Sequence, residues 1–230
     1  ISGLSVAHEL AAPLKNTLVL TMGSLCVTLG IAVPIGVLSA THRHPLLSRI
    51  ASQGAYLISA APLYWLGYFA IYFFTVKLGW FPLLTGVEPA QVRWVYFILP
   101  IFLLGIGNGA LGEIIRHIRE EVSTILQQEY IQAALARGVN IWKHLAKNAL
   151  VPVMGIMTAR LTLLLGGAAV VEYVFSFPGI GYKAFTAADE QDYPIVLGIT
   201  VLLVICVRLI KIASDLICGI VDPRFFQRGL

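Results

Sequence analysis

The segment EYIQAALARGVNIWKHLAKNALVP, residues 129–152, is a polar and basic stretch between long runs of apolar residues. Its spacing favours a helix. Apolar side chains at Ile141, Trp142, Leu145 and Ala149 recur at i, i+1, i+4 and i+8, which places them on one helical face. We therefore expect part of this segment to be an amphipathic helix held between two apolar spans.

Gly138 divides the polar segment into two parts. Glycine readily adopts the left-handed conformation that ends a helix, so the sequence predicts two short helices joined there, within a segment 129–149. Ala133, Ala134 and Gly138 form a surface of small residues that side chains of another protein can approach closely. The residues alone leave a second interpretation open, which is an amphipathic helix at the lipid interface.

The composition is that of an integral membrane protein. Of the 230 residues, 58% are hydrophobic and 12% are charged, whereas soluble domains carry about 25% charged residues. The mean hydropathy is +0.83. The net charge of +4 is spread over loops rather than gathered in a patch, which does not favour nucleic-acid binding.

The apolar runs predict an all-α polytopic membrane bundle, a single transmembrane domain over residues 1–230. Each run is long enough for a helix that crosses about 30 Å of hydrocarbon, and none alternates as a β-span does. The five predicted spans are, approximately, 16–41, 50–76, 94–112, 148–171 and 194–218. We expect the third to continue into the cytosol as one helix, with its apolar face given by Ile114, Ile115, Ile118, Val122, Ile125 and Leu126.

Lysine and arginine placement predicts the orientation of the spans. The loops after the first and third spans, together with the C-terminal tail, are rich in these residues and are expected to be cytoplasmic. The present N-terminus is then outside and the C-terminus cytoplasmic. The basic residues in question are Arg43, Arg49, Arg116, Arg119, Arg137, Lys143, Lys147, Arg224 and Arg228.

Arg160 lies near the middle of the fourth span. A charge there costs about 2.5–3.5 kcal/mol on insertion scales, and such residues generally face a bundle interior or a water-filled cavity. The sequence leaves three roles open for Arg160: lining a substrate pathway, a structural ion pair, or a long side chain that snorkels to the interface. Glu172, near the outer end of the same span, is expected to be structural or to take part in docking.

No catalytic or metal-binding constellation is found in the sequence. It contains no GxxxxGK followed by Ser or Thr, so ATP phosphates cannot be bound by that loop. His8 and Glu9 begin an HExxH pattern, but Ala12 stands in place of the second histidine. The cysteines lack metal-ligand spacing. We expect no enzyme activity, no catalytic residue, no metal and no cofactor in this chain.

Several motifs, in order along nearly the whole chain, resemble the permease subunits of binding-protein-dependent ABC importers, in the dipeptide, oligopeptide and nickel branch. The central one, Tyr130 to Gly138, resembles the cytoplasmic "EAA" loop. The other matching positions are Asn16-Thr17-Leu18, Pro34-Ile35-Gly36-Val37, Leu78-Gly79-Trp80-Phe81-Pro82, His144, Asn148-Ala149-Leu150, Pro152, Gly166-Gly167-Ala168, Glu172, Phe175, Pro178-Gly179-Ile180-Gly181, Asp192-Tyr193-Pro194 and Asp222-Pro223-Arg224.

The resemblance implies a six-helix core, the first helix of which is missing from this chain. The chain begins at Ile1 without a methionine, and we expect a segment to precede it. The resemblance also implies a related second permease, two ATPase subunits that bind the ATP, and a solute-binding protein outside. The chain would form half of the translocation pathway for peptides or for nickel or other metal chelates in a bacterial inner membrane.

In this family the 129–149 segment is the coupling helix that docks on an ATPase, which here implies Gln132, Ala133, Ala134, Gly138, Ile141 and Trp142. Two features depart from the family pattern. Gln132 stands where the EAA trio begins with glutamate, and the ten-residue interval from Gly138 to Asn148 is about one helical turn shorter than expected. The main alternative function is a secondary transporter or channel subunit without an ATPase, for which the spans lack central acidic residues. An intramembrane enzyme is disfavoured because no catalytic constellation is present.

Overall fold

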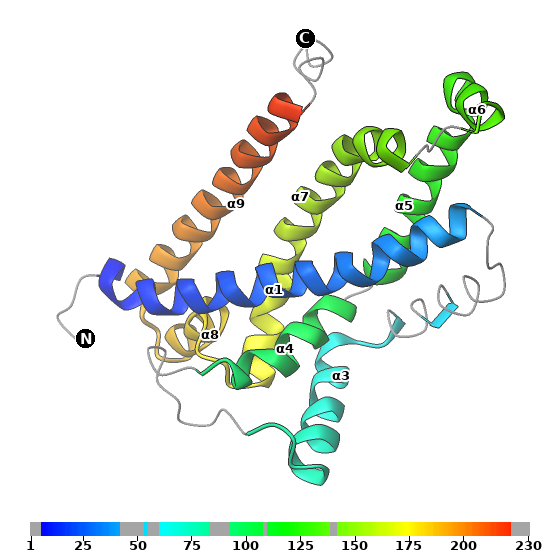
Figure 1. The fold of residues 1–230 in the computed structure, drawn as a ribbon. Coiled ribbons are helices and arrows are strands. Elements are labelled where there is room, and N and C mark those ends of the chain that lie inside the picture. Colours follow the sequence, from blue (N-terminus) through cyan, green and yellow to red (C-terminus); the bar gives the residue numbers. More distant parts are fainter. Residues whose placement is uncertain are drawn as a thin grey trace.

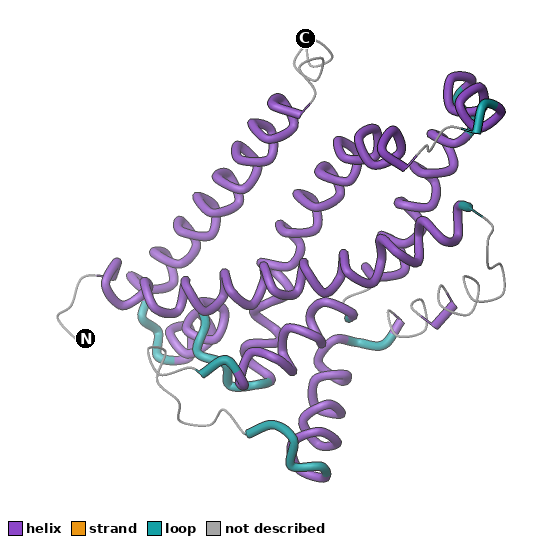
Figure 2. The backbone as a smooth tube through the Cα atoms, in the orientation of Figure 1, coloured by secondary structure: helices purple, strands orange, loops and turns teal. Residues whose placement is uncertain are grey.

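The computed structural model describes residues 6–41, 53, 54, 60–82, 93–107, 110–138 and 142–221. Within these ranges the elements are helices joined by turns, with no strand, in agreement with the predicted all-α class (Figure 2). In chain order they are α1 (Val6–Ala40), α3 (Leu63–Ala70), the π-helix η1 (Ile71–Lys77), α4 (Val95–Ile106), α5 (Ala110–Leu126), α6 (Glu129–Ala136), α7 (Trp142–Val174), α8 (Ile180–Asp189) and α9 (Tyr193–Val221).

Helix α1 is the longest element and packs against α4, α5 and α7. It begins at Val6, earlier than the span predicted from Asn16. One of its faces is polar yet buried, and three hydroxyls on it lie within hydrogen-bond distance of the carbonyl oxygen four residues earlier, so these three donors have partners. The buried hydroxyl-bearing residues involved are Thr21, Ser24 and Thr28.

The expectation that the third span continues as one helix is wrong. Helix α4 ends at Gly107, whose backbone is extended, and α5 runs at 58° to α4. Glycine is a weak helix former, and a neighbouring helix can compensate for the lost backbone bonds. Here the Thr28 hydroxyl of α1 donates to the carbonyl oxygen of Gly105 at 2.6 Å. The break is therefore supported by a hydrogen bond from α1.

Helix α5 carries the predicted pattern. Its isoleucines, together with Val122, are buried in an apolar cluster with Ala32 of α1. Arg116, Arg119 and Glu120 are exposed on the opposite face. Both faces follow from the helical period, and the apolar face fixes the position of α5 against α1.

The described part of the predicted second span consists of α3 and η1, which follow each other without a gap. Its outer surface carries a stack of aromatic rings, Trp65 on Phe69 and Phe69 on Phe73, with ring centroids 5.9 and 6.0 Å apart. All three rings are exposed in this chain. Within the first part of the predicted span, only residues 53, 54 and 60–62 are also described.

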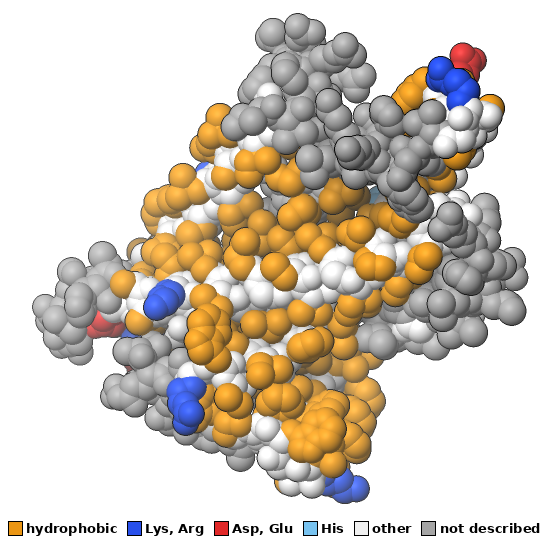
Figure 3. All heavy atoms as spheres, in the orientation of Figure 1, with side chains coloured by type: hydrophobic (Ala, Val, Ile, Leu, Met, Phe, Trp, Pro, Cys, Tyr) orange, Lys and Arg blue, Asp and Glu red, His pale blue; other side chains and the backbone are white. Residues whose placement is uncertain are grey.

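Three described helices are long and apolar enough to cross a membrane: Glu9–Ala40, Val153–Val174 and Tyr193–Gly219. The bent pair of α4 and α5 gives a fourth if it is one span. Figure 1 shows α6 and the last turn of α9 at one end of the bundle and α8 at the other. On the face drawn in Figure 3, apolar side chains cover most of the middle, while charged ones lie toward the ends and at the α6 tip.

Candidate functional site

The polar segment singled out by the sequence projects from one end of the bundle, where α6 turns away from α5 (Figure 1). We call residues 127–138 the elbow. Its helix α6 ends at Ala136, and Gly138 follows with φ of +70°. The Gly138 N–H donates to the carbonyl oxygen of Leu135 at 2.9 Å. Because side chains are strained in this left-handed conformation, the predicted glycine cap is confirmed.

The second predicted short helix is not a separate element. Helix α7 begins at Trp142 and runs unbroken to Val174, so the helical segment after the elbow continues into the fourth predicted span. The continuity means that α5 and α7, the two helices that flank the elbow, both enter the bundle. Ile141 lies outside the described residues, and so does the side chain of Trp142.

The elbow presents a mixed surface. Ile131 is fully buried and Ala134 is 8% exposed, so these two residues hold α6 against the rest of the chain. Gln132, Ala133 and Gly138 are exposed. The outward surface is completed by two large side chains and one basic side chain, Tyr130, Leu135 and Arg137. Of the six residues expected to dock, the three exposed ones are therefore accessible.

Gln132 has a specific internal contact. Its Nε2 donates to the carbonyl oxygen of Leu126 at 2.7 Å. Leu126 is the last residue of α5, where carbonyl oxygens lack helical partners. A glutamate at this position could not donate when ionised. The amide that departs from the family pattern thus ties α6 to the end of α5.

Arg160 is buried inside the chain, with 2% of its surface exposed. Its Nε, Nη1 and Nη2 atoms have no hydrogen-bond partner in the structure. On the same side of α7, Met157 and Leu164 pack in the apolar core. The neighbouring helix α5 carries Glu113 in its first turn, and that charge favours the charged form of Arg160. Arg160 therefore faces the neighbouring helices and lies outside any pocket described below.

Glu172 is also fully buried, but its carboxylate is satisfied. Thr17 of α1 donates its hydroxyl to Oε1 at 2.6 Å. The N–H groups of Gly181 and Tyr182 donate to Oε2 at 2.7 and 3.1 Å. These amides belong to the first turn of α8, where a negative charge is stabilised by the helix dipole. Glu172 thus joins α7, α8 and α1, which is the structural role expected for it.

The turn before α8 closes around this carboxylate. Asn16 donates to the carbonyl oxygen of Pro178 at 3.0 Å, and the Ile180 N–H donates to the Thr17 hydroxyl at 2.8 Å. A Cβ atom at Gly179 would overlap the Glu172 carboxylate. Two stretches that are far apart in the sequence, residues 16–17 and residues 172–182, therefore meet in one cluster.

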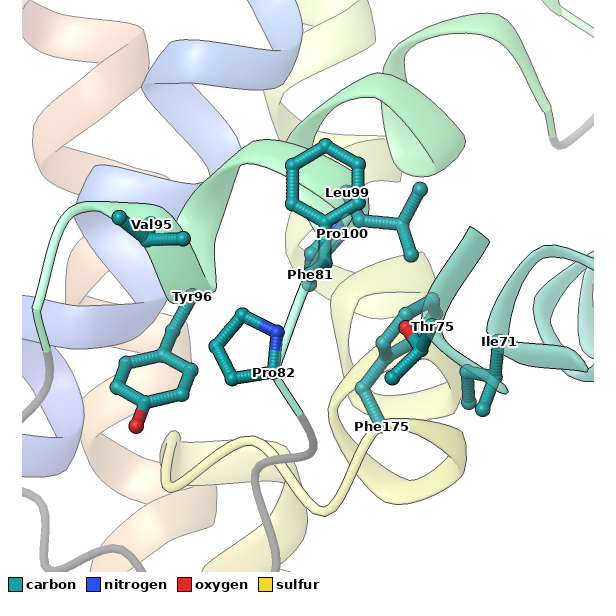
Figure 4. Close-up of a pocket in the computed structure, with 9 residues that line it drawn as sticks. All are labelled: Ile71, Thr75, Phe81, Pro82, Val95, Tyr96, Leu99, Pro100 and Phe175. Atoms are coloured by element: carbon teal, nitrogen blue, oxygen red, sulfur yellow. The ribbon is translucent and has the colours of Figure 1, made fainter. Parts of the chain in front are cut away.

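A small pocket lies between η1, the start of α4 and the turn after α7 (Figure 4). Its polar atoms are few, and Figure 4 shows the Tyr96 hydroxyl pointing away from the other labelled side chains. With no charged side chain, it has the chemistry of a packing gap rather than of a site for a polar solute. The lining residues are Ile71, Thr75, Phe81, Pro82, Val95, Tyr96, Leu99, Pro100 and Phe175.

A second hollow lies between α7 and α9 and is lined mainly by apolar groups, with Arg208 and Thr162 as its polar members. Within the described residues, no group of three or more His, Cys, Asp or Glu side chains is arranged to hold a metal ion.

Glu113 was not among the residues expected from the sequence to matter. That Glu113 lies on a helix packed against the helix of Arg160 follows only from the packing of α5 on α7.

The chain matches the family described as "Binding-protein-dependent transport system inner membrane component" over residues 32–227. It is 33% identical to the oligopeptide transport system permease protein AppB of Bacillus subtilis, over 96% of this chain and 72% of that protein. It is 31% identical to the glutathione transport system permease protein GsiC of Pectobacterium atrosepticum, over 97% of this chain and 72% of the relative.

More distant relatives extend the comparison. The metal-staphylopine import system permease protein CntB of Staphylococcus aureus is 27% identical, over 97% of this chain and 71% of that protein. Among solved structures, an inward-facing conformation of the MetNI methionine ABC transporter matches with a TM-score of 0.72 and 25% identity, covering 93% of this chain and 96% of the other. The chain therefore belongs to the binding-protein-dependent transport system inner membrane components, the multi-pass permease subunits of ABC importers.

Proposed function

We propose that this chain forms half of the translocation pathway of an importer for peptides or metal chelates, driven by ATP hydrolysis in separate subunits. The relatives support this range of cargo, since their names refer to oligopeptides, glutathione and metal-staphylopine. The partners are a related second permease, two ATPase subunits and an extracytoplasmic solute-binding protein. We expect the chain itself to contribute no catalytic residue, metal or cofactor.

The observation that carries the proposal is the elbow. It projects at one end of the bundle, between two helices that both enter the core. An ATPase bound to its exposed surface at Gln132, Ala133 and Gly138 would therefore move α5 and α7 together. Ile141 and Trp142 are expected to extend that contact, while Ala134 keeps α6 seated on the chain.

The orientation that we propose places the elbow and the C-terminus in the cytoplasm and the present N-terminus outside. The placement of lysine and arginine supports it. The fold is consistent with this orientation, because α6 and the end of α9 lie at the same end of the bundle (Figure 1). The Glu172 cluster then lies at the outer end, on the side of the binding protein.

Arg160 is proposed as a residue of the pathway that is reached only when helices separate. Its 2% exposure means that cargo cannot contact it in this conformation. An opening of α7 relative to its neighbours would bring the guanidinium to the cavity. Arg160→Gln should then reduce both uptake and substrate-stimulated ATP hydrolysis while the complex stays assembled.

The function is tested at Ala133, which is exposed on α6. The variant Ala133→Phe in the complete importer should lose ATPase subunits during purification and lose ATP-dependent uptake, since a bulky side chain blocks a close contact. The matched control is Ala188→Phe, an exposed alanine on α8 at the opposite end. It should retain both.

Retention of ATPases and uptake in Ala133→Phe would count against the docking surface. Uptake that proceeds in vesicles without any ATPase subunit would support the alternative, a secondary transporter or channel. The measurement is therefore uptake with and without ATP, combined with the subunit composition of the purified complex.

A further inference from the structure

Arg160 presents a physical problem that the proposed function does not solve. A guanidinium carries five N–H donors and stays charged. Here it is 2% exposed, and its nitrogen atoms donate no hydrogen bond. A buried charge without a partner is strongly destabilising. This arrangement is therefore disfavoured relative to any state of the working cycle in which Arg160 gains a partner.

The charged groups on the helices packed against α7 narrow the choice of partner. On α9, Asp215 is exposed, next to Ser214, whose hydroxyl meets Thr158 of α7. On α5, which packs against α7, Glu113 lies in the first turn, and its charge also favours the charged form of Arg160. Glu120, about two turns further along α5, is held by Arg116 at 3.2 Å. On α1, Glu9 meets Lys183 at 3.3 Å, near the Glu172 end. Glu113 is therefore the best-placed partner.

Glu113 is also free to change contacts. Its side chain is 59% exposed, and its Oε1 lies 3.7 Å from Nε2 of His117 on the same helix. Exposed pairs of this kind contribute little, at most about 1 kcal/mol. Glu113 also lies near the start of α5, just after the break that follows α4. A small rotation of α5 would turn the Glu113 carboxylate toward a different neighbour, and little free energy would be lost with the His117 contact.

We propose that Glu113 leaves His117 and pairs with Arg160 in one state of the transport cycle, forming an ion pair between α5 and α7. This inference rests on the proposed function, because the motion that makes and breaks the pair enters through the elbow. The two helices that carry the pair are the two that flank the elbow. The pair is thus a positioning contact between α5 and α7 that depends on where the ATPases have moved α6.

The first test is a double-mutant cycle in the complete importer, reconstituted with its binding protein. Glu113→Gln and Arg160→Gln should each reduce ATP-dependent uptake about tenfold, and the double variant should be no worse than either, because coupled residues are not additive. The reversed pair, Glu113→Arg with Arg160→Glu, should recover part of the activity. Asp215→Asn is the matched control on α9 and should stay within about twofold of the wild type.

Two results would overturn the pair. One is multiplication of the single effects to about a hundredfold loss in the double variant. The other is loss of uptake in Arg160→Gln with normal uptake in Glu113→Gln, which would assign Arg160 to cargo or to another subunit. If Arg160→Gln does not assemble, Arg160→Lys and the reversed pair test the same coupling with the charge retained.

A distance measurement gives a readout that does not depend on uptake. With Cys26, Cys206 and Cys218 replaced by serine, Glu113→Cys with Arg160→Cys should cross-link in only one of the nucleotide-free and ATP-trapped states. Equal cross-linking in both states, or none in either, contradicts the exchange. Failure of the proposed function is recognised separately, because the wild-type complex would then show no ATP-dependent uptake.

Discussion

Among the described side chains of helix α7, two charged ones are buried, and their surroundings are opposite. Glu172 accepts three hydrogen bonds, two of them from the first turn of α8. Arg160, three turns earlier in the helix, makes none. Both are almost completely shielded from solvent. The difference is therefore not one of burial but of whether the fold supplies partners.

The C-terminal end of α7, at Glu172, and its middle, at Arg160, therefore differ in how firmly they are held. At the Glu172 end, polar contacts from α1 and from the first turn of α8 over-determine the position of one carboxylate. A region held in this way resists local opening. Arg160 packs beside the apolar Met157 and Leu164, and its guanidinium makes no hydrogen bond in this state. A change of conformation therefore gains most in the middle of α7, where it could give Arg160 a partner.

The largest effect is expected from Glu172→Ala. The change leaves the Thr17 hydroxyl and two amides of α8 buried without an acceptor, which should lower the free energy of unfolding by at least about 3 kcal/mol. A thermal unfolding scan of the purified complex measures it. Glu190→Gln, an exposed acid just after α8, is the control and should be neutral. An unchanged transition in Glu172→Ala would mean that the cluster is not a stability element.

The next effect is expected from Gly179→Ala. The added methyl group would overlap the Glu172 carboxylate, and overpacking of this kind costs about 2 kcal/mol. The same unfolding measurement applies. Gly166→Ala is matched to it, since a Cβ at Gly166 meets nothing within 4 Å, and it should not destabilise. Equal unfolding transitions in the two variants would contradict the view that the Glu172 cluster is packed more tightly than the middle of α7.

Arg160→Met should behave in the opposite way to Glu172→Ala. Replacing a buried, unpaired charge by an apolar side chain of similar length should leave stability within about 1 kcal/mol of the wild type or raise it. Uptake should nevertheless fall. A loss of stability as large as that of Glu172→Ala would show that Arg160 has a partner in the resting state.

The smallest effect is expected at the elbow, from Gln132→Glu. Loss of the amide that donates to Leu126 should cost about 1 kcal/mol and speed hydrogen exchange of the α6 amides about fivefold. Hydrogen-exchange mass spectrometry measures this. Gln127→Glu is a suitable control, because the Gln127 amide contacts only the Ser123 hydroxyl, at 3.5 Å. Unchanged exchange in α6 would indicate that Ile131 and Ala134 alone seat this helix.

Much of the fold could be predicted from local pattern. The isoleucines of α5 face inward as their spacing indicates, and the elbow ends at Gly138 because few other residues adopt its φ of +70°. The break at Gly107 could not be predicted in the same way. Glycines are common in membrane helices for packing, and only the donated hydroxyl of Thr28 shows that this one is accommodated as an end.

The candidate site was harder to predict than the fold. The sequence placed Arg160 in mid-span. Which acidic residue can pair with it depends on how α5 packs on α7, and no local spacing encodes that packing. The same holds for the Glu172 cluster. Asn16 and Thr17 lie more than 150 residues from the groups they bind, as their separations of 162, 155 and 163 residues show.

The break between α4 and α5 also determines how a force can travel. Helix α4 ends at Ile106 and α5 runs at 58° to it, so a push along the axis of α5 is not directed along α4. It passes sideways into α1, whose Ala32 packs with α5 and whose Leu20 and Leu25 pack with α4. Helix α1 therefore connects the motions of α4 and α5. If the break at Gly107 were replaced by continuous helix, α4 and α5 would move as one rigid helix, and the motion would no longer need to pass through α1.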